Sequence, residues 1–151
     1  MHLSDKRWTV ITKVSSVAYA QAVIRAWQDR SILIPFDASA LAVLPQLAEA
    51  DVVPIPPGGG WFDTKIELNK TAEPAQISFS SGTTGRPKPI LISRRAISDT
   101  CGRLIDFMQI DHSIREYIGV PLTYSFGLAR LRTVAAAGGR SYLPENGFRL
   151  D

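Results

Sequence analysis

Short apolar runs and stretches with helical periodicity alternate along the first third of the chain. The apolar runs indicate strands of a parallel sheet that is covered on both faces. Ser15 or Ser16 can cap the first helix, whose apolar face carries Val17, Ala20, Val23 or Ile24, and Trp27. The expected elements are a strand over Trp8–Thr12, this helix, a strand over Ser31–Phe36, a helix over Ala40–Ala48 that Pro45 should kink, and a strand over Asp51–Ile55. This βαβαβ order predicts right-handed crossovers in a doubly wound sheet.

The periodicity lapses at residues 56–60, which read PPGGG. Proline and glycine in succession are a loop signal. A further strand is expected over Phe62–Leu68, and Asn69–Pro74 is polar again. Residues 56–75 are therefore interpreted as a loop-rich connection.

The alternation resumes in the second half of the chain. Ser93 can cap a helix with an apolar face made of Ile97, Cys101, Leu104, Ile105 and Met108. Gly138 or Gly139 should end a later helix. The expected elements are strands over Gln76–Ser80 and Pro89–Ile92, a helix over Arg94–Met108, a strand over Tyr117–Val120, a helix over Ser125–Ala137 and a strand over Arg140–Leu143.

The predicted fold class is α/β, with a mostly parallel doubly wound sheet and helices on both faces. Residues 1–151 suit one domain or subdomain, with a βαβαβ unit at 1–55, the connection at 56–75 and a second α/β unit at 76–151. With 45 % hydrophobic and 21 % charged residues the composition is that of a globular protein. No apolar run approaches the roughly 18–20 residues that span a bilayer. The amino terminus lacks a signal-peptide pattern, so a cytoplasmic protein is expected.

Charge and cysteine content exclude several other classes. The net charge of +3 is mild, and the cations are dispersed except for Arg86, Lys88, Arg94 and Arg95, so a small anionic ligand is favoured over nucleic acid. Cys101 is the single cysteine, which excludes an intramolecular disulfide, and a buried small hydrophobe is favoured over a reactive thiol. The two histidines lack metal-ligand spacing, so no metal site is expected.

The strongest chemical signal is the stretch Ser80–Lys88, which reads SSGTTGRPK. Its glycines allow the backbone to turn consecutive N–H groups toward one ligand. Its serine and threonine hydroxyls add donors, and Lys88 adds a compact charge that can reach phosphate oxygens. A strand is expected on each side of it. This strand–loop–strand setting and the glycine spacing differ from a Walker loop, which opens a helix, and from the GxGxxG dinucleotide motif.

These residues resemble the signature loop of the adenylate-forming, or AMP-binding, superfamily. Its members include acyl-CoA synthetases, adenylation domains of nonribosomal peptide synthetases, and luciferases. Two further segments, Trp8–Ser39 and Pro121–Leu143, resemble in order and spacing the segments before and after the loop in this superfamily. The resemblance covers nearly the whole chain, and it corresponds to an early part of the large amino-terminal domain of these enzymes.

The resemblance implies ATP-dependent activation of a carboxylic acid. It assigns contacts with the ATP phosphates to Ser81, Gly82, Thr83, Thr84, Gly85 and Lys88, with Thr84 and Lys88 stabilising the departing pyrophosphate. It assigns the wall of the acid pocket to Tyr124, Ser125, Phe126 and Gly127, although Tyr124 read alone could equally be a core tyrosine. ATP and Mg²⁺ are the implied cofactors, the Mg²⁺ ligands lying mostly outside this chain. Coenzyme A or a carrier-protein phosphopantetheine is the implied acceptor.

The chain also departs from the superfamily pattern. Pro89 stands where glycine is usual, which removes one backbone donor, and Arg94 stands where histidine is common. The adenine contacts, the magnesium-binding glutamate and the late lysine of the superfamily are not found before Asp151. We therefore expect a truncated portion that is inactive alone and self-associates through exposed apolar surface. The alternative is a non-catalytic nucleotide- or partner-binding module that retains the fold.

Overall fold

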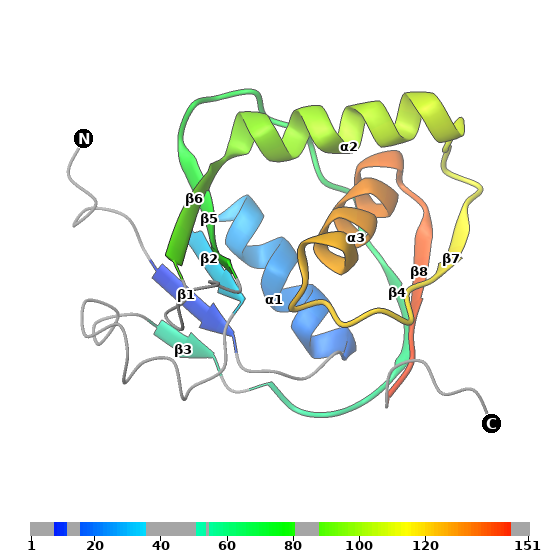
Figure 1. Ribbon diagram of the computed structural model, residues 1–151. Helices are drawn as coiled ribbons and strands as arrows, with labels where there is room; N and C mark the ends of the chain where they lie inside the picture. Colours follow the sequence, from blue (N-terminus) through cyan, green and yellow to red (C-terminus); the bar gives the residue numbers. More distant parts are fainter. Residues whose placement is uncertain (1–7, 12–15, 36–50, 54, 81–87, 146–151) are drawn as a thin grey trace.

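The computed structural model describes residues 8–11, 16–35, 51–53, 55–80 and 88–145. Two sheets enclose a layer of helices, with α2 lying along one end of this layer (Figure 1). The elements are β1 (Trp8–Ile11), α1 (Val17–Gln28), β2 (Ile32–Pro35), β3 (Asp51–Val53), β4 (Gly60–Asp63), β5 (Pro74–Ser80), β6 (Lys88–Ser93), α2 (Arg94–Met108), β7 (Arg115–Tyr117), α3 (Ser125–Ala137) and β8 (Arg140–Leu143).

The first sheet has five strands in the order β3-β1-β2-β5-β6. β1 pairs in parallel with both β2 and β3, and β2 pairs in parallel with β5. β6 returns antiparallel to β5 at the edge of the sheet. The buried side chains of Ile32, Leu33 and Ile34 fit the prediction that β2 is covered on both faces. The α/β class is confirmed, and this sheet is mostly parallel as expected.

The helix boundaries match the capping residues found in the sequence. The Ser16 hydroxyl accepts a hydrogen bond from the Tyr19 N–H at 3.1 Å, and α1 follows. The Ser93 hydroxyl accepts one from the Ala96 N–H at 3.2 Å and starts α2. Gly138, with a left-handed φ of 76°, ends α3. The start of α2 at Ser93 was thus predicted correctly. For the start of α1 the sequence offered Ser15 or Ser16, and for the end of α3 Gly138 or Gly139; the structure shows Ser16 and Gly138.

A second sheet of three strands, in the order β4-β8-β7, was not distinguished from the first in the sequence. Two strand predictions were wrong in their bounds. The strand expected over Phe62–Leu68 is β4, which ends at Asp63. The backbone after Asp63 forms hydrogen bonds outside the sheet, since the Ile66 N–H donates to the Ala135 carbonyl at 3.2 Å. The strand expected over Tyr117–Val120 is β7, which ends at Tyr117 and pairs in parallel with β8.

The core lies between the two sheets and draws on both. Side chains from the five-stranded sheet, the three-stranded sheet and all three described helices form one cluster, including Leu33, Phe62, Cys101, Leu131 and Leu143. The helix predicted over Ala40–Ala48 lies outside the described residues. That this helix covers one face of the five-stranded sheet therefore stays a prediction. Within the described part of the chain no helix is long and apolar enough to cross a membrane.

The apolar face predicted for α2 is confirmed over its first half and wrong at its end. Ile97 and Cys101 are buried, whereas Met108 is 51 % exposed. Met108 lies at the surface, and its sulfur accepts a hydrogen bond from Arg130 Nη1 at 3.1 Å. The apolar periodicity of α2 thus continues past the part of the helix that is buried.

Candidate functional site

The two strands that flank the predicted phosphate loop are paired at its base. Ser80, the last residue of β5, lies opposite Lys88, the first residue of β6. The strand–loop–strand setting is therefore confirmed, with Lys88 exposed at the loop end of β6. The predicted contacts Ser81, Gly82, Thr83, Thr84 and Gly85 lie outside the described residues.

The loop follows the carboxyl end of β5, which runs parallel to β2 and hence to β1 and β3. In open α/β sheets ligands bind beyond the carboxyl ends of the parallel strands. The topology thus gives the Ser80–Lys88 connection the position that a ligand-binding loop requires.

Pro89 occupies a place in the sheet that tolerates proline. Pro89 is in β6, the edge strand of the five-stranded sheet, and it lies opposite Phe79 of β5. An edge strand lacks one set of ladder hydrogen bonds, so a proline there costs less than in a central strand. The departure from glycine at this position is compatible with the strand that carries Lys88.

The segment predicted to line the acid pocket lies at the start of α3. Tyr124 is 63 % exposed, so it is not a core tyrosine. Ser125 and Phe126 are also exposed, while Gly127 is buried against the preceding turn. A Cβ at Gly127 would lie 2.6 Å from the Pro121 carbonyl oxygen, so this close approach requires glycine.

A cavity of about 150 Å³ lies beneath this segment, between the first halves of α2 and α3 and the strands β5 and β6. Of the four predicted pocket residues, Ser125 lines it. Much of the remaining lining is aliphatic or small. The polar side chains of Gln76, from β5, and Arg132, from α3, face one another in the cavity. The lining residues are Gln76, Ile92, Ala96, Ile97, Thr100, Cys101, Ser125, Ala129 and Arg132.

Arg132 is a buried cation in the wall of this cavity. Its side chain is 3 % exposed, and its Nη1 donates to the Gln76 side-chain oxygen at 2.7 Å. Its Nε has no hydrogen-bond partner among the described residues, and within the same part of the chain it pairs with no carboxylate. Burial lowers the pKa of Arg132 to about 10; the nearby Cys101 and Tyr19 side chains act in the opposite direction.

Arg132 was not among the site residues predicted from the sequence. The available signal was the placement of two arginines, Arg130 and Arg132, within the apolar residues of a predicted helix. Arg130 is paired, its guanidinium donating to both carboxylate oxygens of Glu116. Of these two arginines only Arg132 faces the cavity.

Cys101, on the opposite wall of the cavity, is fully buried. Its burial raises the pKa of the thiol. The burial confirms the interpretation of Cys101 as a small hydrophobe, since reactive cysteines are exposed and have lowered pKa values.

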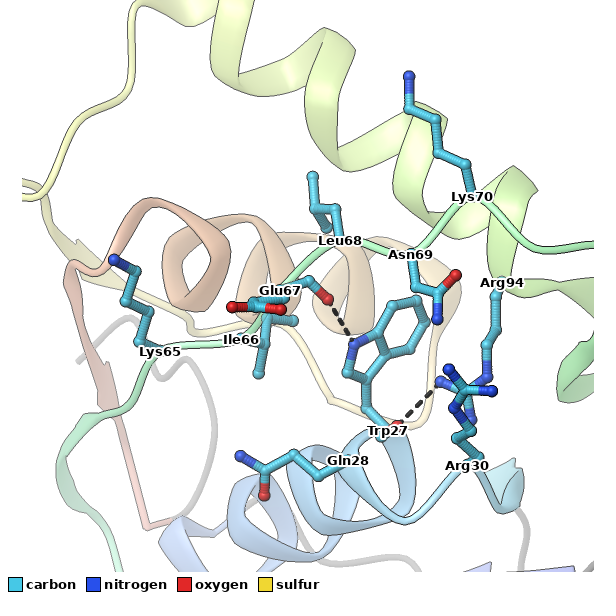
Figure 2. A pocket seen from close by; sticks show the side chains of 10 residues that line it. All are labelled: Trp27, Gln28, Arg30, Lys65, Ile66, Glu67, Leu68, Asn69, Lys70 and Arg94. Atoms are coloured by element: carbon cyan, nitrogen blue, oxygen red, sulfur yellow. Dashed lines mark hydrogen bonds between the residues drawn. The ribbon is translucent and has the colours of Figure 1, made fainter.

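Arg94 lies at the other end of β6 from Lys88, so the predicted grouping of these two cations is wrong. A strand of this length separates the two positions by roughly 17 Å. The Arg94 side chain is 1 % exposed, and its Nη1 donates to the Trp27 carbonyl at 2.9 Å, as Figure 2 shows. Its guanidinium also lies 4.8 Å from the centroid of the Trp27 ring. Arg94 therefore fastens the end of α1 to the start of α2.

A surface groove of about 490 Å³ adjoins this contact, between the end of α1, the segment 65–70 and the start of α2. Lys65, Glu67 and Lys70 line it, as do Arg30 and Asn69 (Figure 2). Lys70 is paired with Asp99 at 3.5 Å, and Arg30 with Glu73 at 3.5 Å. The charges of Lys70 and Arg30 in this groove are thus partly neutralised.

Comparison with known proteins agrees with the resemblance found in the sequence. The family model described as "AMP-binding enzyme" matches residues 3–151. Nonribosomal peptide synthetase GRA1 of Gibberella zeae is 32 % identical over 79 residues, which are 52 % of this chain and 1 % of that protein. Nonribosomal peptide synthetase 8 of Aspergillus fumigatus is 26 % identical over 88 residues, 58 % of this chain and 1 % of that protein.

Solved structures share the fold at low sequence identity. A malonyl-CoA ligase with methylmalonyl-CoA and AMP bound has a TM-score of 0.67 at 21 % identity, over 88 % of this chain and 34 % of that one. A long-chain-fatty-acid-CoA ligase from Archaeoglobus fulgidus has a TM-score of 0.67 at 12 % identity, over 95 % of this chain and 36 % of that one. The chain thus spans about a third of these structures, and about 1 % of the peptide synthetases.

Proposed function

Because the chain belongs to the AMP-binding enzyme family, we propose that it contributes to ATP-dependent activation of a carboxylic acid. In this reaction a carboxylate oxygen attacks the α-phosphorus of ATP. The bond from that phosphorus to the β-bridging oxygen breaks, so that acyl-adenylate and pyrophosphate form. A thiol then attacks the acyl carbon and releases AMP, giving a thioester.

The observation that carries this proposal is the pairing of Ser80 with Lys88 at the carboxyl edge of the parallel strands. It holds the two ends of the SSGTTGRPK stretch together where ligands of open sheets bind. The departing pyrophosphate carries several negative charges. In the proposal the loop N–H groups, the hydroxyls of Ser81, Thr83 and Thr84, and the Lys88 ammonium stabilise these charges.

The proposal assigns contacts with ATP to this chain and assigns no metal ligand to it. Among the described residues no group of three or more acidic, histidine or cysteine side chains is placed to hold a metal ion. No step of the proposal therefore depends on a metal ion held by these residues. Tyr124, Ser125, Phe126 and Gly127 are proposed to border the acid, and coenzyme A or a carrier-protein phosphopantetheine is the proposed acceptor.

Equilibrium binding of ATP tests the assigned loop. In titration calorimetry we expect Lys88→Ala and Thr84→Ala to weaken binding by roughly tenfold or more, since each removes a donor to a charged phosphate. Lys65→Ala is the matched control, because Lys65 is likewise exposed but lines the groove beside Arg94. Equal affinity of Lys88→Ala and wild type would contradict the proposal.

Catalysis is tested separately with ATP–pyrophosphate exchange. We expect ATP binding without exchange from the 151 residues alone, because the superfamily's late lysine and magnesium-binding glutamate are not found among them. Robust exchange by this chain would show that it holds a sufficient catalytic set.

A further inference from the structure

We propose that the cavity between α2 and α3 takes the far end of the activated acid, and that Arg132 binds a second carboxylate carried there. The substrate class would be dicarboxylic acids of about eight carbons. This inference rests on the proposed acid activation, and it concerns which acid is selected.

The buried charge of Arg132 is incompletely paired. The described residues give the Arg132 guanidinium one neutral acceptor, the Gln76 amide oxygen, and leave Nε without a partner. Buried charges are normally paired, because the loss of hydration is costly unless an opposite charge and hydrogen bonds replace it. A ligand carboxylate would supply both, with the planar fork geometry that a guanidinium matches.

The neighbours of Arg132 strengthen this argument. A second cation, Arg94, lies on the same Trp27 ring, with the two guanidinium carbons 4.8 Å and 5.7 Å from its centroid. Arg94 has Glu73 at 3.7 Å, whereas Arg132 has no such carboxylate within the described ranges. An anion in the cavity would therefore meet a positive local field.

The size and lining of the cavity fit the end of such an acid. An apolar cavity of about 150 Å³ holds a molecule of about benzene's size, or roughly six non-hydrogen atoms. A carboxylate with two or three methylene groups has this size. Ile92, Ile97 and Ala129 offer apolar walls for the methylenes, while Arg132 and Gln76 offer polar groups.

The cavity also adjoins the segment that is proposed to border the acid. Ser125, in the segment proposed to border the acid, lines the cavity, and so does Gln76 on β5, the strand that leads to the loop. Four residues of strand separate Gln76 from Ser80, roughly 13 Å. A dicarboxylic acid of about eight carbons is long enough to place one carboxylate near the loop edge and the other at Arg132.

The test is a binding experiment on the chain itself, followed by ¹⁵N-edited NMR that includes the arginine Nε–H signals. The probes are dicarboxylic acids of four to eight carbons, the monocarboxylic acids of equal length, and acetate and chloride at matched ionic strength. We expect the Arg132 Nε–H signal to shift with a dicarboxylic acid, and at least a tenfold weaker effect from the monocarboxylic acid.

Two variants separate binding from folding. Arg132→Gln removes the charge and should weaken dicarboxylate binding at least tenfold, while Arg103→Gln, on the exposed face of α2, should leave it unchanged. Ala129→Leu keeps Arg132 but fills the cavity, and should also abolish binding. Retained signal dispersion in the ¹⁵N spectra shows that each variant is folded.

The proposal is overturned if no dicarboxylic acid binds, if mono- and dicarboxylic acids bind equally, or if Arg132→Gln binds as wild type does. A shift equal to that caused by acetate or chloride would also overturn it, because the cavity would then be a simple anion site. Binding of ATP at Lys88 is measured independently. If ATP binds and dicarboxylic acids do not, this inference fails and the proposed function stands.

Discussion

Replacing Arg132 by methionine should stabilise the protein, although it removes a buried hydrogen bond. The side chain is 3 % exposed, and within the described chain it is paired with no carboxylate. Replacing a buried ion pair or triad by apolar side chains of similar volume is often neutral or stabilises by about 1–4 kcal/mol, and Arg132→Met leaves no carboxylate of the described chain unpaired. Methionine is unbranched and flexible, so it can follow the path of the arginine stem.

Two losses reduce the expected gain. The hydrogen bond from Arg132 to Gln76 at 2.7 Å has a charged donor, and such bonds contribute about 1.5–3 kcal/mol. The guanidinium carbon also lies 5.7 Å from the Trp27 centroid, a contact of about 0.5–1 kcal/mol. Relief of the desolvation of one ion, several kcal/mol, opposes both. We expect a net gain of about 1–2 kcal/mol, or ~2–8 °C in Tm for a chain of this length.

The assay is urea and thermal unfolding followed by circular dichroism. Arg103→Met is the control, because an exposed position on α2 should change stability by less than about 0.5 kcal/mol. A loss of more than about 1 kcal/mol in Arg132→Met would refute the reasoning. It would show that the native fold satisfies this guanidinium and needs no ligand to do so.

Other predictions concern residues other than Arg132. Arg94→Met should lower stability by about 2 kcal/mol in the same unfolding assay, because it removes the charged donor to the Trp27 carbonyl, and an unchanged midpoint would contradict this. Ellman's reagent at pH 8 should label Cys101 slowly in the folded protein and rapidly in urea, because burial raises the pKa of the thiol; rapid native labelling would count against it. Hydrogen bonds from the Ser113 hydroxyl and N–H lower the pKa of Asp111, so its stabilising contribution is present above the unfolded pKa and lost as the pH falls through the folded one. Ser113→Ala should raise that pKa in an NMR titration of the carboxyl, and an unshifted curve would refute the assignment.

Helix ends were predictable because their determinants are local. Ser16 and Ser93 each accept a hydrogen bond from the N–H three residues later, a geometry that depends only on the adjacent backbone. The strand limits at β4 and β7 were not predictable in the same way. They are set by pairing with β8, which is distant from β4 in the sequence, so the apolar pattern near Phe62 and Ile118 could not reveal them.

The candidate site shows the same division. The residue types of the Ser80–Lys88 loop and the strands beside it indicated its place in the fold, and the pairing of its two ends agrees. The burial of Arg132 could not be predicted, because it depends on how α3 packs against α2 and β5. The predicted grouping of Arg94 with Lys88 was wrong. Although the two residues are close in sequence, the extended strand β6 between them places them at opposite ends of the sheet.

The loop at the carboxyl edge of β5 is proposed to bind the phosphates of ATP. Titration of the ¹⁵N-labelled chain with inorganic pyrophosphate tests this binding most directly. We predict saturable shifts concentrated in the amides of residues 80–88, and the loss of these shifts in Lys88→Ala. Shifts confined to the groove lined by Lys65 and Lys70, or no saturable shift at all, would contradict it.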